Sequence, residues 1–420
     1  MDNLLHWLWL SLSVKAGGES FRKLYDSLGT VSEIYSADED VLKSVIGSRS
    51  GDFNALLDKD LEKAKEVLEF CRSKNVGILL YSDERFPENL RKIKNPPVLL
   101  YYRGNLPDFK NELCISIVGT RSVSDYGRKN AFYVARDLAK SGALIVSGMA
   151  IGIDGVALAG ALSEGRPTVA VIGSGIDVCY PSQHKRLARE IVKRGCVMTE
   201  YAPGTRPLGA NFPVRNRIIS GLSEAVAVIE GREKSGSLIT ARRAFDQGRT
   251  VYALPANVDE KNGEATNLLI KNGARAFSSA DDIIRDFDVT HKGKLNPFNL
   301  LSPSSKSIAS VLSEYEVAAV SPSDKVFLHS ARKKKSVKTE TEIPIEVEFP
   351  IVDEDENEKK LSKLDPHLRA LYEKIPKGKS ISQESLVSLD LPMRELMRSL
   401  LKLELLGLVS LLPGEMIRRG

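Results

Sequence analysis

The fold of this chain is decided by the stretch Ile115-Ser116-Ile117-Val118-Gly119-Thr120-Arg121. A short, largely apolar run of this kind is typical of a strand buried inside a parallel sheet. The Gly-Thr-Arg that follows predicts a turn whose backbone amides are free to hold an anion, with the cation of Arg121 beside them. The stretch therefore predicts a buried strand that ends in an anion-binding turn.

The same pattern of an apolar run followed by small residues recurs up to residue 277. Further strands are expected at 143–146, 168–172, 225–229 and 250–254, and helices between them at 130–141, 184–194 and 238–247. Alternating strands and helices joined by short turns predict the α/β class, here an extended Rossmann-like doubly wound parallel sheet. Because the carboxyl ends of parallel strands share one edge, the glycine-containing turns are expected to open into one crevice.

Composition sets broad limits on the class of protein. The chain has 420 residues, long enough for two to four domains, and a net charge of only +5, so no polyanion partner follows from overall charge. Its four cysteines have neither CxxC spacing nor a pairing pattern, which suits a reducing cytoplasm and predicts no metal site. The apolar run 4–12 is too short for a membrane span and is interpreted as a core helix, so no membrane association is expected.

Changes in composition and hydrophobic spacing along the sequence predict four segments. Residues 1–74 contain short amphipathic patterns separated by glycines, as in SAM-like or helix-hairpin-helix modules, and the turn at Gly17-Gly18 is weighed as a nucleic-acid contact against simple packing. Residues 75–288 are expected to form a Rossmann-like domain. Residues 289–360 combine Ser/Pro/Lys tracts with blocks of like charge, which predicts a flexible charged linker. Residues 361–420 regain helical spacing before a final strand pair, which indicates a winged-helix (DML1-like) domain.

The candidate binding residues come from four loops of the central domain. Glycine turns, arginines and small hydroxyl side chains at helix starts suit phosphate groups, and an aromatic ring suits a base. The predicted set is Gly119, Thr120, Arg121, Ser147, Gly148, Gly152, Phe212, Arg215, Asn216, Arg217, Ser235, Gly236 and Ser237. In the structural alternative, Phe212 belongs to the core, Arg215 and Arg217 pair with Glu200, Glu224 or Glu230, and the serines cap a helix.

Catalytic groups are few in this region. His184 is the one histidine of the central domain, and no Cys-His or Ser-His-Asp grouping is evident. The acids Asp154, Asp177 and Glu200 each follow a strand, where they could act as bases or bond loop amides and arginines. The loops thus favour holding a polyanion over cleaving one, so no enzyme activity, catalytic residue, metal or cofactor is predicted.

Several long motifs resemble the DprA/Smf family of bacterial DNA-processing proteins. They include the three residues from Gly119, the eight from Ser147, the twelve from Ala170, the twelve from Phe212 and the seven from Ser235. The resemblance implies a cytosolic protein without enzyme activity that binds single-stranded DNA during natural transformation, loads the RecA recombinase onto it and forms homodimers through its Rossmann-like domain. Mapped by motif, it implies a DNA pocket formed by Arg121, Phe212, Arg215 and Arg217.

Two rival functions stay open at this point. One is a nucleotide-processing enzyme of the lysine-decarboxylase-like group, whose members are nucleoside monophosphate phosphoribohydrolases. That group has a similar fold, but its members use a Pro-Gly-Gly-x-Gly-Thr loop and a following Glu. The corresponding loop here, 231–237, lacks that pattern, and Glu230 precedes it. The other rival is an adaptor whose flanking domains dock proteins. Release of base from nucleotides would identify the first, and absence of oligonucleotide binding the second.

Overall fold

The structure is a computed structural model of the whole chain. It describes residues 2–233, 235–291, 293–301, 306–318, 365–375, 380–382, 399–400, 403, 408–412 and 416–419. The chain divides into two compact units, Met1–Lys338 and Thr339–Gly420, and each is described by itself.

Short helices form the N-terminal part of the first unit: α1 (Asp2–Ser13), α2 (Ser20–Leu28), α3 (Val31–Ser36), α4 (Glu39–Ile46), α5 (Phe53–Leu57) and α6 (Glu62–Ser73). Local signals explain their starts, for example the capping box of Thr30 and Glu33 at α3. The turn at Gly17 faces the protein interior, because its carbonyl accepts a hydrogen bond from Asn95 and a Cβ there would lie 2.7 Å from Val214. These contacts support the packing alternative for this turn.

The centre of the first unit is a nine-stranded sheet of order β1-β2-β6-β5-β4-β3-β7-β8-β9. Its strands are β1 (Gly77–Leu80), β2 (Leu99–Gly104), β3 (Cys114–Val118), β4 (Leu144–Ser147), β5 (Thr168–Val171), β6 (Cys196–Thr199), β7 (Ala225–Val228), β8 (Thr250–Ala253) and β9 (Arg275–Ala276). From β6 to β9 all neighbours are parallel, whereas β2 pairs antiparallel with β6 and β1 with β2. The predicted doubly wound parallel sheet is confirmed, with an antiparallel extension at one edge.

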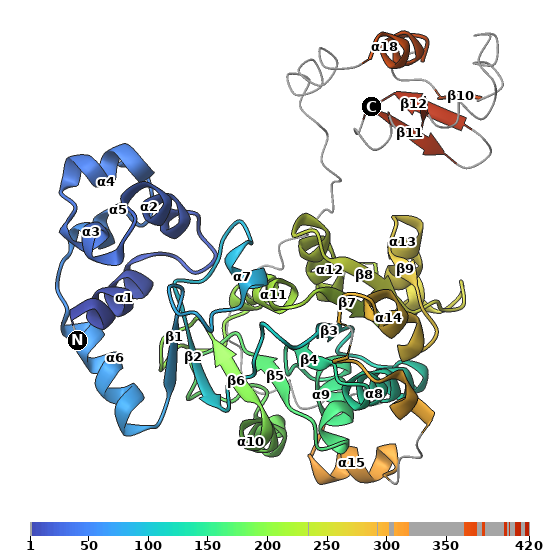
Figure 1. Cartoon of the computed structure of the whole chain (residues 1–420), viewed down its shortest axis with the longest axis horizontal. Coiled ribbons are helices and arrows are strands. Elements are labelled where there is room, and N and C mark those ends of the chain that lie inside the picture. Colours follow the sequence, from blue (N-terminus) through green and yellow to red (C-terminus); the bar gives the residue numbers. More distant parts are fainter. Residues whose placement is uncertain are drawn as a thin grey trace, which may run out of the picture. The chain divides into compact units, whose positions relative to one another are not determined.

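Helices cover both faces of this sheet (Figure 1). In the view of Figure 1, α8 (Asp125–Lys140) and α9 (Ile153–Ser163) lie below the central strands, and α11 (Asn211–Leu222) and α12 (Gly236–Asp246) lie above them. The remaining helices are α7 (Glu88–Arg91), η1 (Ser182–His184), α10 (Lys185–Arg194), η2 (Lys261–Gly263), α13 (Glu264–Lys271) and α14 (Ala280–Phe287). The order of connections reverses between β3 and β7, which makes their carboxyl ends the switch point where α/β proteins bind ligands.

The reversal requires close packing around the end of β3. All five residues of β3 are buried, as expected for a strand covered on both faces. At Gly119 a Cβ would lie 2.6 Å from Ile153 and 2.9 Å from the Glu230 carbonyl oxygen, so only glycine fits there. Gly152 has φ +88° and lies against the Thr120 carbonyl, which joins the turns after β3 and β4.

Part of the predicted linker belongs to the folded unit. Residues 297–301 form η3 (Pro297–Leu301), and α15 (Ile308–Glu314) packs against α9. The expectation of a flexible linker is therefore wrong for 306–318, because the spacing of Val311 and Tyr315 places both on one helix face and both are buried. The rest of the predicted linker, 319–360, lies outside the described residues.

Only parts of the second unit are described. They are α18 (Pro366–Glu373) and an antiparallel sheet of order β10-β12-β11, with β10 (Ser380–Ser382), β11 (Val409–Leu412) and β12 (Met416–Arg419). A small core includes Leu371, Tyr372 and Ile417. Most of the helical part expected within 361–420 lies outside the described residues, so the winged helix and the four segment boundaries stay predictions.

Candidate functional site

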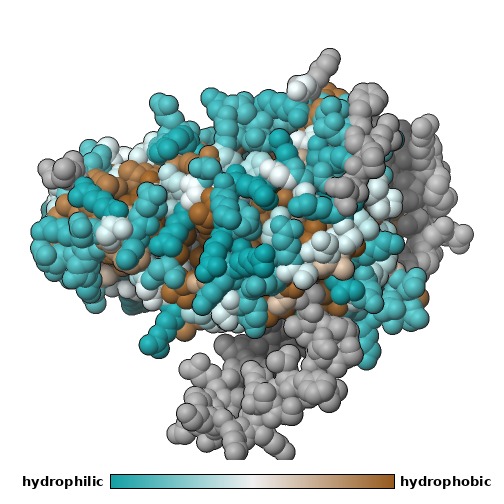
Figure 2. Space-filling view, turned by 90° about the horizontal axis from the view of Figure 1, so that it is seen from below, coloured by the Kyte–Doolittle hydropathy of each residue, from teal (hydrophilic) through white to brown (hydrophobic). Residues whose placement is uncertain are grey.

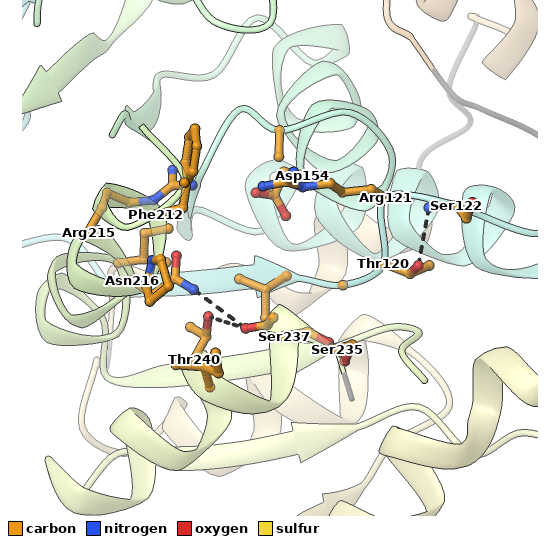
Figure 3. A pocket seen from close by; sticks show the side chains of 18 of the residues that line it. Thr120, Arg121, Ser122, Asp154, Phe212, Arg215, Asn216, Ser235, Ser237 and Thr240 are labelled. Atoms are coloured by element: carbon orange, nitrogen blue, oxygen red, sulfur yellow. Dashed lines mark hydrogen bonds between the residues drawn. The ribbon is translucent and has the colours of Figure 1, made fainter. Parts of the chain in front are cut away.

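A cavity of about 620 Å³ opens at the switch point (Figure 3). Its walls come from the turns after β3, β4, β5 and β7 and from the start of α11. The lining residues are Val118, Gly119, Thr120, Arg121, Ser122, Ala150, Asp154, Tyr180, Pro207, Gly209, Phe212, Pro213, Arg215, Asn216, Ile219, Arg232, Ser235, Gly236, Ser237, Ile239 and Thr240. The crevice expected from the sequence is therefore present and collects several loops.

A cation and two aromatic rings lie together at this cavity. The exposed Arg121 places its guanidinium carbon 5.3 Å from the centroid of the Phe212 ring. The Tyr180 ring lies 5.5 Å from that of Phe212 at an interplanar angle of 37°, and Tyr180 is 42% exposed. Because both rings border the cavity, they offer flat apolar surface next to a positive charge.

Arg215 forms the wall of the cavity rather than a free cation. Its Nη1 donates to the carbonyl oxygen of Gly148 at 2.7 Å and to that of Val171, while its Nε is buried without a hydrogen-bond partner. Burial lowers the pKa of Arg215 to about 10, so the side chain is charged at pH 7. Burial likewise raises the pKa of the nearby Asp154 carboxyl. The positive charge of Arg215 partly offsets this rise. Arg215 and Asp154 together fix the turn after β4.

The N-terminus of α12 forms the opposite side of the cavity. Ser235 is the N-cap residue, yet its side chain makes no capping bond; its Oγ is hydrogen-bonded to the Ser237 Oγ at 2.7 Å. The first turn of the helix is held to α11 through Asn216, whose Nδ2 donates to the Gly236 carbonyl at 3.5 Å (Figure 3). Free backbone amides and the helix dipole favour an anion at this position.

Glu230 holds the loop that carries Arg121. Its carboxylate accepts hydrogen bonds from the backbone amide of Ser124 at 3.0 Å and from the Ser124 hydroxyl, at the start of α8. Its carbonyl oxygen accepts from the Thr120 amide at 2.8 Å. Burial raises the pKa of the Glu230 carboxyl. The residue is thus committed to structure on both its side chain and its backbone.

The structure separates the predicted residues into two groups. Nine line the cavity: Gly119, Thr120, Arg121, Phe212, Arg215, Asn216, Ser235, Gly236 and Ser237. Gly148 borders a small adjoining hollow with Arg121 and Phe212. Ser147 is buried and donates to the Ile117 carbonyl, and the Gly152 amide donates to the Ala318 carbonyl, so neither faces the cavity. Their assignment as phosphate contacts is corrected.

Arg217 requires the same correction. Its guanidinium forms an ion pair with Glu200, and both side chains are almost fully buried. Residues 211–222 form one helix, α11, on which Arg215 and Arg217 are two positions apart and therefore face different directions. The structural alternative of an Arg–Glu pair thus holds for Arg217, and the predicted convergence of three guanidinium groups is reduced to Arg121 and Arg215.

Sequence reasoning missed two prominent side chains of the cavity. Tyr180 stacks beside Phe212, and the exposed Arg232 lines the side formed by the β7–α12 loop, where its Nε donates to Asn262 at 3.2 Å. Both residues lie in loops that follow predicted strands. The sequence therefore already indicated that they lie at the carboxyl edge of the sheet, where the cavity was expected. Within the part of the chain that the structure describes, no group of three acidic, His or Cys residues could hold a metal, and no helix is long and apolar enough to cross a membrane.

Comparison with known proteins decides the family. A model of the family described as DNA recombination-mediator protein A matches residues 77–288, which contain the whole cavity. The chain belongs to this family. The DNA processing protein DprA of Bacillus subtilis is 36% identical over 236 residues, covering 56% of this chain and 80% of that protein. The DprA of Streptococcus pneumoniae is 41% identical over 220 residues, covering 52% of this chain and 76% of that protein.

A solved structure of a family member supports the same conclusion. The X-ray structure of DprA from Streptococcus pneumoniae aligns with a TM-score of 0.59 and 32% identity, over 66% of this chain and 97% of that one. The resemblance seen in the motifs is thereby confirmed. Membership in the DNA recombination-mediator family gives this chain a role in DNA processing and recombination, and the family is described as mediators rather than by an enzymatic reaction.

Proposed function

We propose that this family member binds single-stranded DNA in the cavity at the switch point. The observation that carries the proposal is the exposed Arg121 beside the Phe212 and Tyr180 rings, facing the N-terminus of α12. Phosphates would lie against Arg121 and the amides of α12, and bases would stack on the two rings. This combination binds flexible strands with little sequence preference.

Geometry favours a single strand over a duplex. The volume of about 620 Å³ lies in the range of sites that hold one small ligand, so it has room for one or two nucleotides. Bases inside a duplex stack on each other and are not presented to protein rings, whereas the bases of a single strand are free to stack on side chains. A cavity that offers stacking surface therefore selects the unpaired form.

The carboxyl groups nearest the cavity support binding without catalysis. Asp154 lies buried against Arg215, and Glu230 is occupied by Ser124, so neither is placed as a free general base. No observation favours the phosphoribohydrolase alternative. Incubation with nucleoside monophosphates tests it directly, since release of free base would show that the cavity cleaves the ligand it binds.

The decisive experiment compares a labelled single-stranded oligonucleotide with its duplex by fluorescence anisotropy at several salt concentrations. We expect the single strand to bind at least ten times more tightly. With Arg121 and Arg232 as the exposed cations of the cavity, log affinity should fall against log salt with a slope of roughly −0.7 to −1.4 per protomer, because each neutralised phosphate contributes about −0.7. Equal affinity for the duplex, or a slope near zero, would contradict the proposal.

We further propose that the protein acts in the cytoplasm as a homodimer through its Rossmann-like domain and loads RecA recombinase onto the bound strand in natural transformation and recombination. The support for this step is the family resemblance. Light scattering measures the assembly state. RecA ATP hydrolysis on a strand covered by single-strand-binding protein measures loading, which should rise with this protein present and fail to rise with Arg121→Ala.

A further inference from the structure

A second groove lies beside α10, on the other side of the loops that border the first cavity. It has a volume of about 470 Å³ and is lined by Arg103, Met149, Ile172, Ile176, Asp177, Val178, Cys179, Lys185, Ala188, Arg189, Val192, Lys193 and Val197. Consecutive residues face the two spaces: Ala150 and Tyr180 line the first cavity, and Met149 and Cys179 line this one. We call it the α10 groove.

The α10 groove combines an apolar floor with a basic rim. Met149, Ile172, Ile176 and Val197 are buried in its floor. The rim carries four cations, Arg103, Lys185, Arg189 and Lys193, against the single carboxylate Asp177. Figure 2, which views the molecule from below the orientation of Figure 1, shows strongly hydrophilic side chains with apolar surface between them on this side.

Most of the rim charge is available to a ligand. Lys193 pairs with Glu190 at 2.5 Å, but this pair is exposed and therefore weak. Asp177 is already engaged, because its Oδ1 accepts the Gly204 amide at 2.8 Å.

The groove lacks the surface that single-stranded DNA needs. None of the described residues that line it is aromatic, so bases would find no ring on which to stack. Phosphates alone would engage the rim and leave the apolar floor exposed to water. A peptide in which apolar side chains alternate with carboxylates covers both, since successive residues of an extended chain point in opposite directions.

We propose that the α10 groove docks an acidic peptide segment whose apolar side chains alternate with carboxylates. The apolar side chains fill the floor between Ile172 and Val197, and the carboxylates meet the cations of the rim. This goes beyond strand binding, because it gives the protein a docking site for a protein partner next to the DNA cavity. Such a partner would be held at the loops that carry Tyr180 and Ala150.

Residues 342–358 of this chain supply a suitable synthetic probe, because they contain eight carboxylates, no Lys or Arg, and apolar residues at 343, 345, 347, 349 and 351. Binding of the fluorescent peptide is measured by anisotropy on the full chain whose own eight carboxylates in 342–358 are changed to Asn or Gln, so that the segment already in the chain does not compete. We expect Arg189→Glu to weaken it at least tenfold and Arg186→Glu, a charge reversal on the same helix outside the groove, less than threefold. A peptide with Ser at its five apolar positions should also bind at least tenfold more weakly.

A chemical footprint provides an independent measurement. Cys179 lines the groove and is partly exposed, whereas Cys71, Cys114 and Cys196 are buried. Bound peptide should slow alkylation of Cys179 by iodoacetamide at least threefold, as measured by mass spectrometry.

No peptide binding, equal losses of affinity in the two arginine variants, or undiminished binding of the Ser-substituted peptide would each overturn the proposal. The proposal would also be overturned if Arg189→Glu lowered the affinity for an oligonucleotide but not the affinity for the peptide. Strand binding at Arg121 is assayed separately, so either idea can fail alone.

Discussion

Two arginines of the same sequence motif have different roles because their surroundings differ. Arg215 is buried but lines the cavity, whereas Arg217 is buried in an ion pair with Glu200. The Nη2 of Arg217 donates to the Oε2 of Glu200, and because Nε and Nη1 of Arg217 and Oε1 of Glu200 are buried without partners, this ion pair is the main compensation for burying the two charges. Arg121, from another loop, is the exposed cation of the set.

At this scale we predict that Arg121→Ala weakens binding of a single-stranded oligonucleotide by roughly tenfold or more, since a charged hydrogen bond is worth about 1.5–3 kcal/mol. The free energy of unfolding should change by no more than about 0.5 kcal/mol, as for other surface positions. Anisotropy and urea unfolding measure the two effects. Arg128→Ala, an exposed arginine of α8 outside the cavity, is the matched control and should leave affinity unchanged.

Arg217→Ala should act on stability instead. Removing one partner of a buried ion pair leaves an uncompensated charge, which costs about 3–5 kcal/mol. The double variant Arg217→Met with Glu200→Leu should recover more than half of that loss, because two apolar side chains need no partner. Urea unfolding of the single and double variants measures both. A stable Arg217→Ala that has lost oligonucleotide binding would restore Arg217 to the DNA site.

At the scale of elements, the two helices that begin at the switch point start differently. Ser124 caps α8, since its Oγ accepts the Gly127 amide at 3.0 Å and its hydroxyl bonds Glu230. Ser235 stands at the same position of α12 but makes no capping bond. The start of α8 is therefore completed internally, and the start of α12 keeps amides available for a ligand.

This difference predicts opposite outcomes for two Ser→Ala changes. Ser124→Ala should lower the free energy of unfolding by about 1–2 kcal/mol, as loss of a cap does. Ser235→Ala should cost less than about 0.5 kcal/mol, yet weaken oligonucleotide binding about threefold by removing a hydroxyl from the cavity. Thermal unfolding and anisotropy on the same samples provide the comparison. A large stability loss in Ser235→Ala would show that this serine is structural.

At the scale of the whole molecule, the segment that leaves the sheet domain is held beside the switch-point cavity. The Gly152 amide donates to the Ala318 carbonyl, and the Ala318 amide donates to His184 Nε2 at 3.0 Å. His184 is buried and its Nδ1 lies 3.0 Å from the Met149 carbonyl, so the neutral ring donates there and accepts from Ala318. Burial lowers the pKa of His184.

A pH dependence follows from this contact. Because the folded-state pKa of His184 lies below its ordinary value of 6.5, the unfolded chain binds the proton more readily. The stabilisation is complete above pH 6.5 and is lost as pH falls through 6.5 towards the folded-state pKa, by at most about 1.4 kcal/mol per pH unit. Urea unfolding at pH 7.5 and 5.5 should show this loss, and His184→Gln should remove it. An unchanged dependence in that variant would contradict the assignment.

The sequence by itself determined the sheet. Largely apolar runs such as 115–118 and 225–229 favour a strand covered on both faces, and the turns after parallel strands share one edge of the sheet. The cavity and nine of the residues that line it followed from that local pattern.

Only the tertiary structure decided which charged groups face the ligand. Arg215 and Arg217 have the same local sequence signal, and what separates them is Glu200, seventeen residues away in the chain but in contact with Arg217. Tyr180 joins Phe212 for the same reason, since loops from different strands meet only once the sheet has formed. Burial and ion pairing depend on contacts between segments that are distant in the sequence. The sequence pattern therefore predicts where the site lies, whereas the tertiary structure determines which of its charged groups are exposed to a ligand.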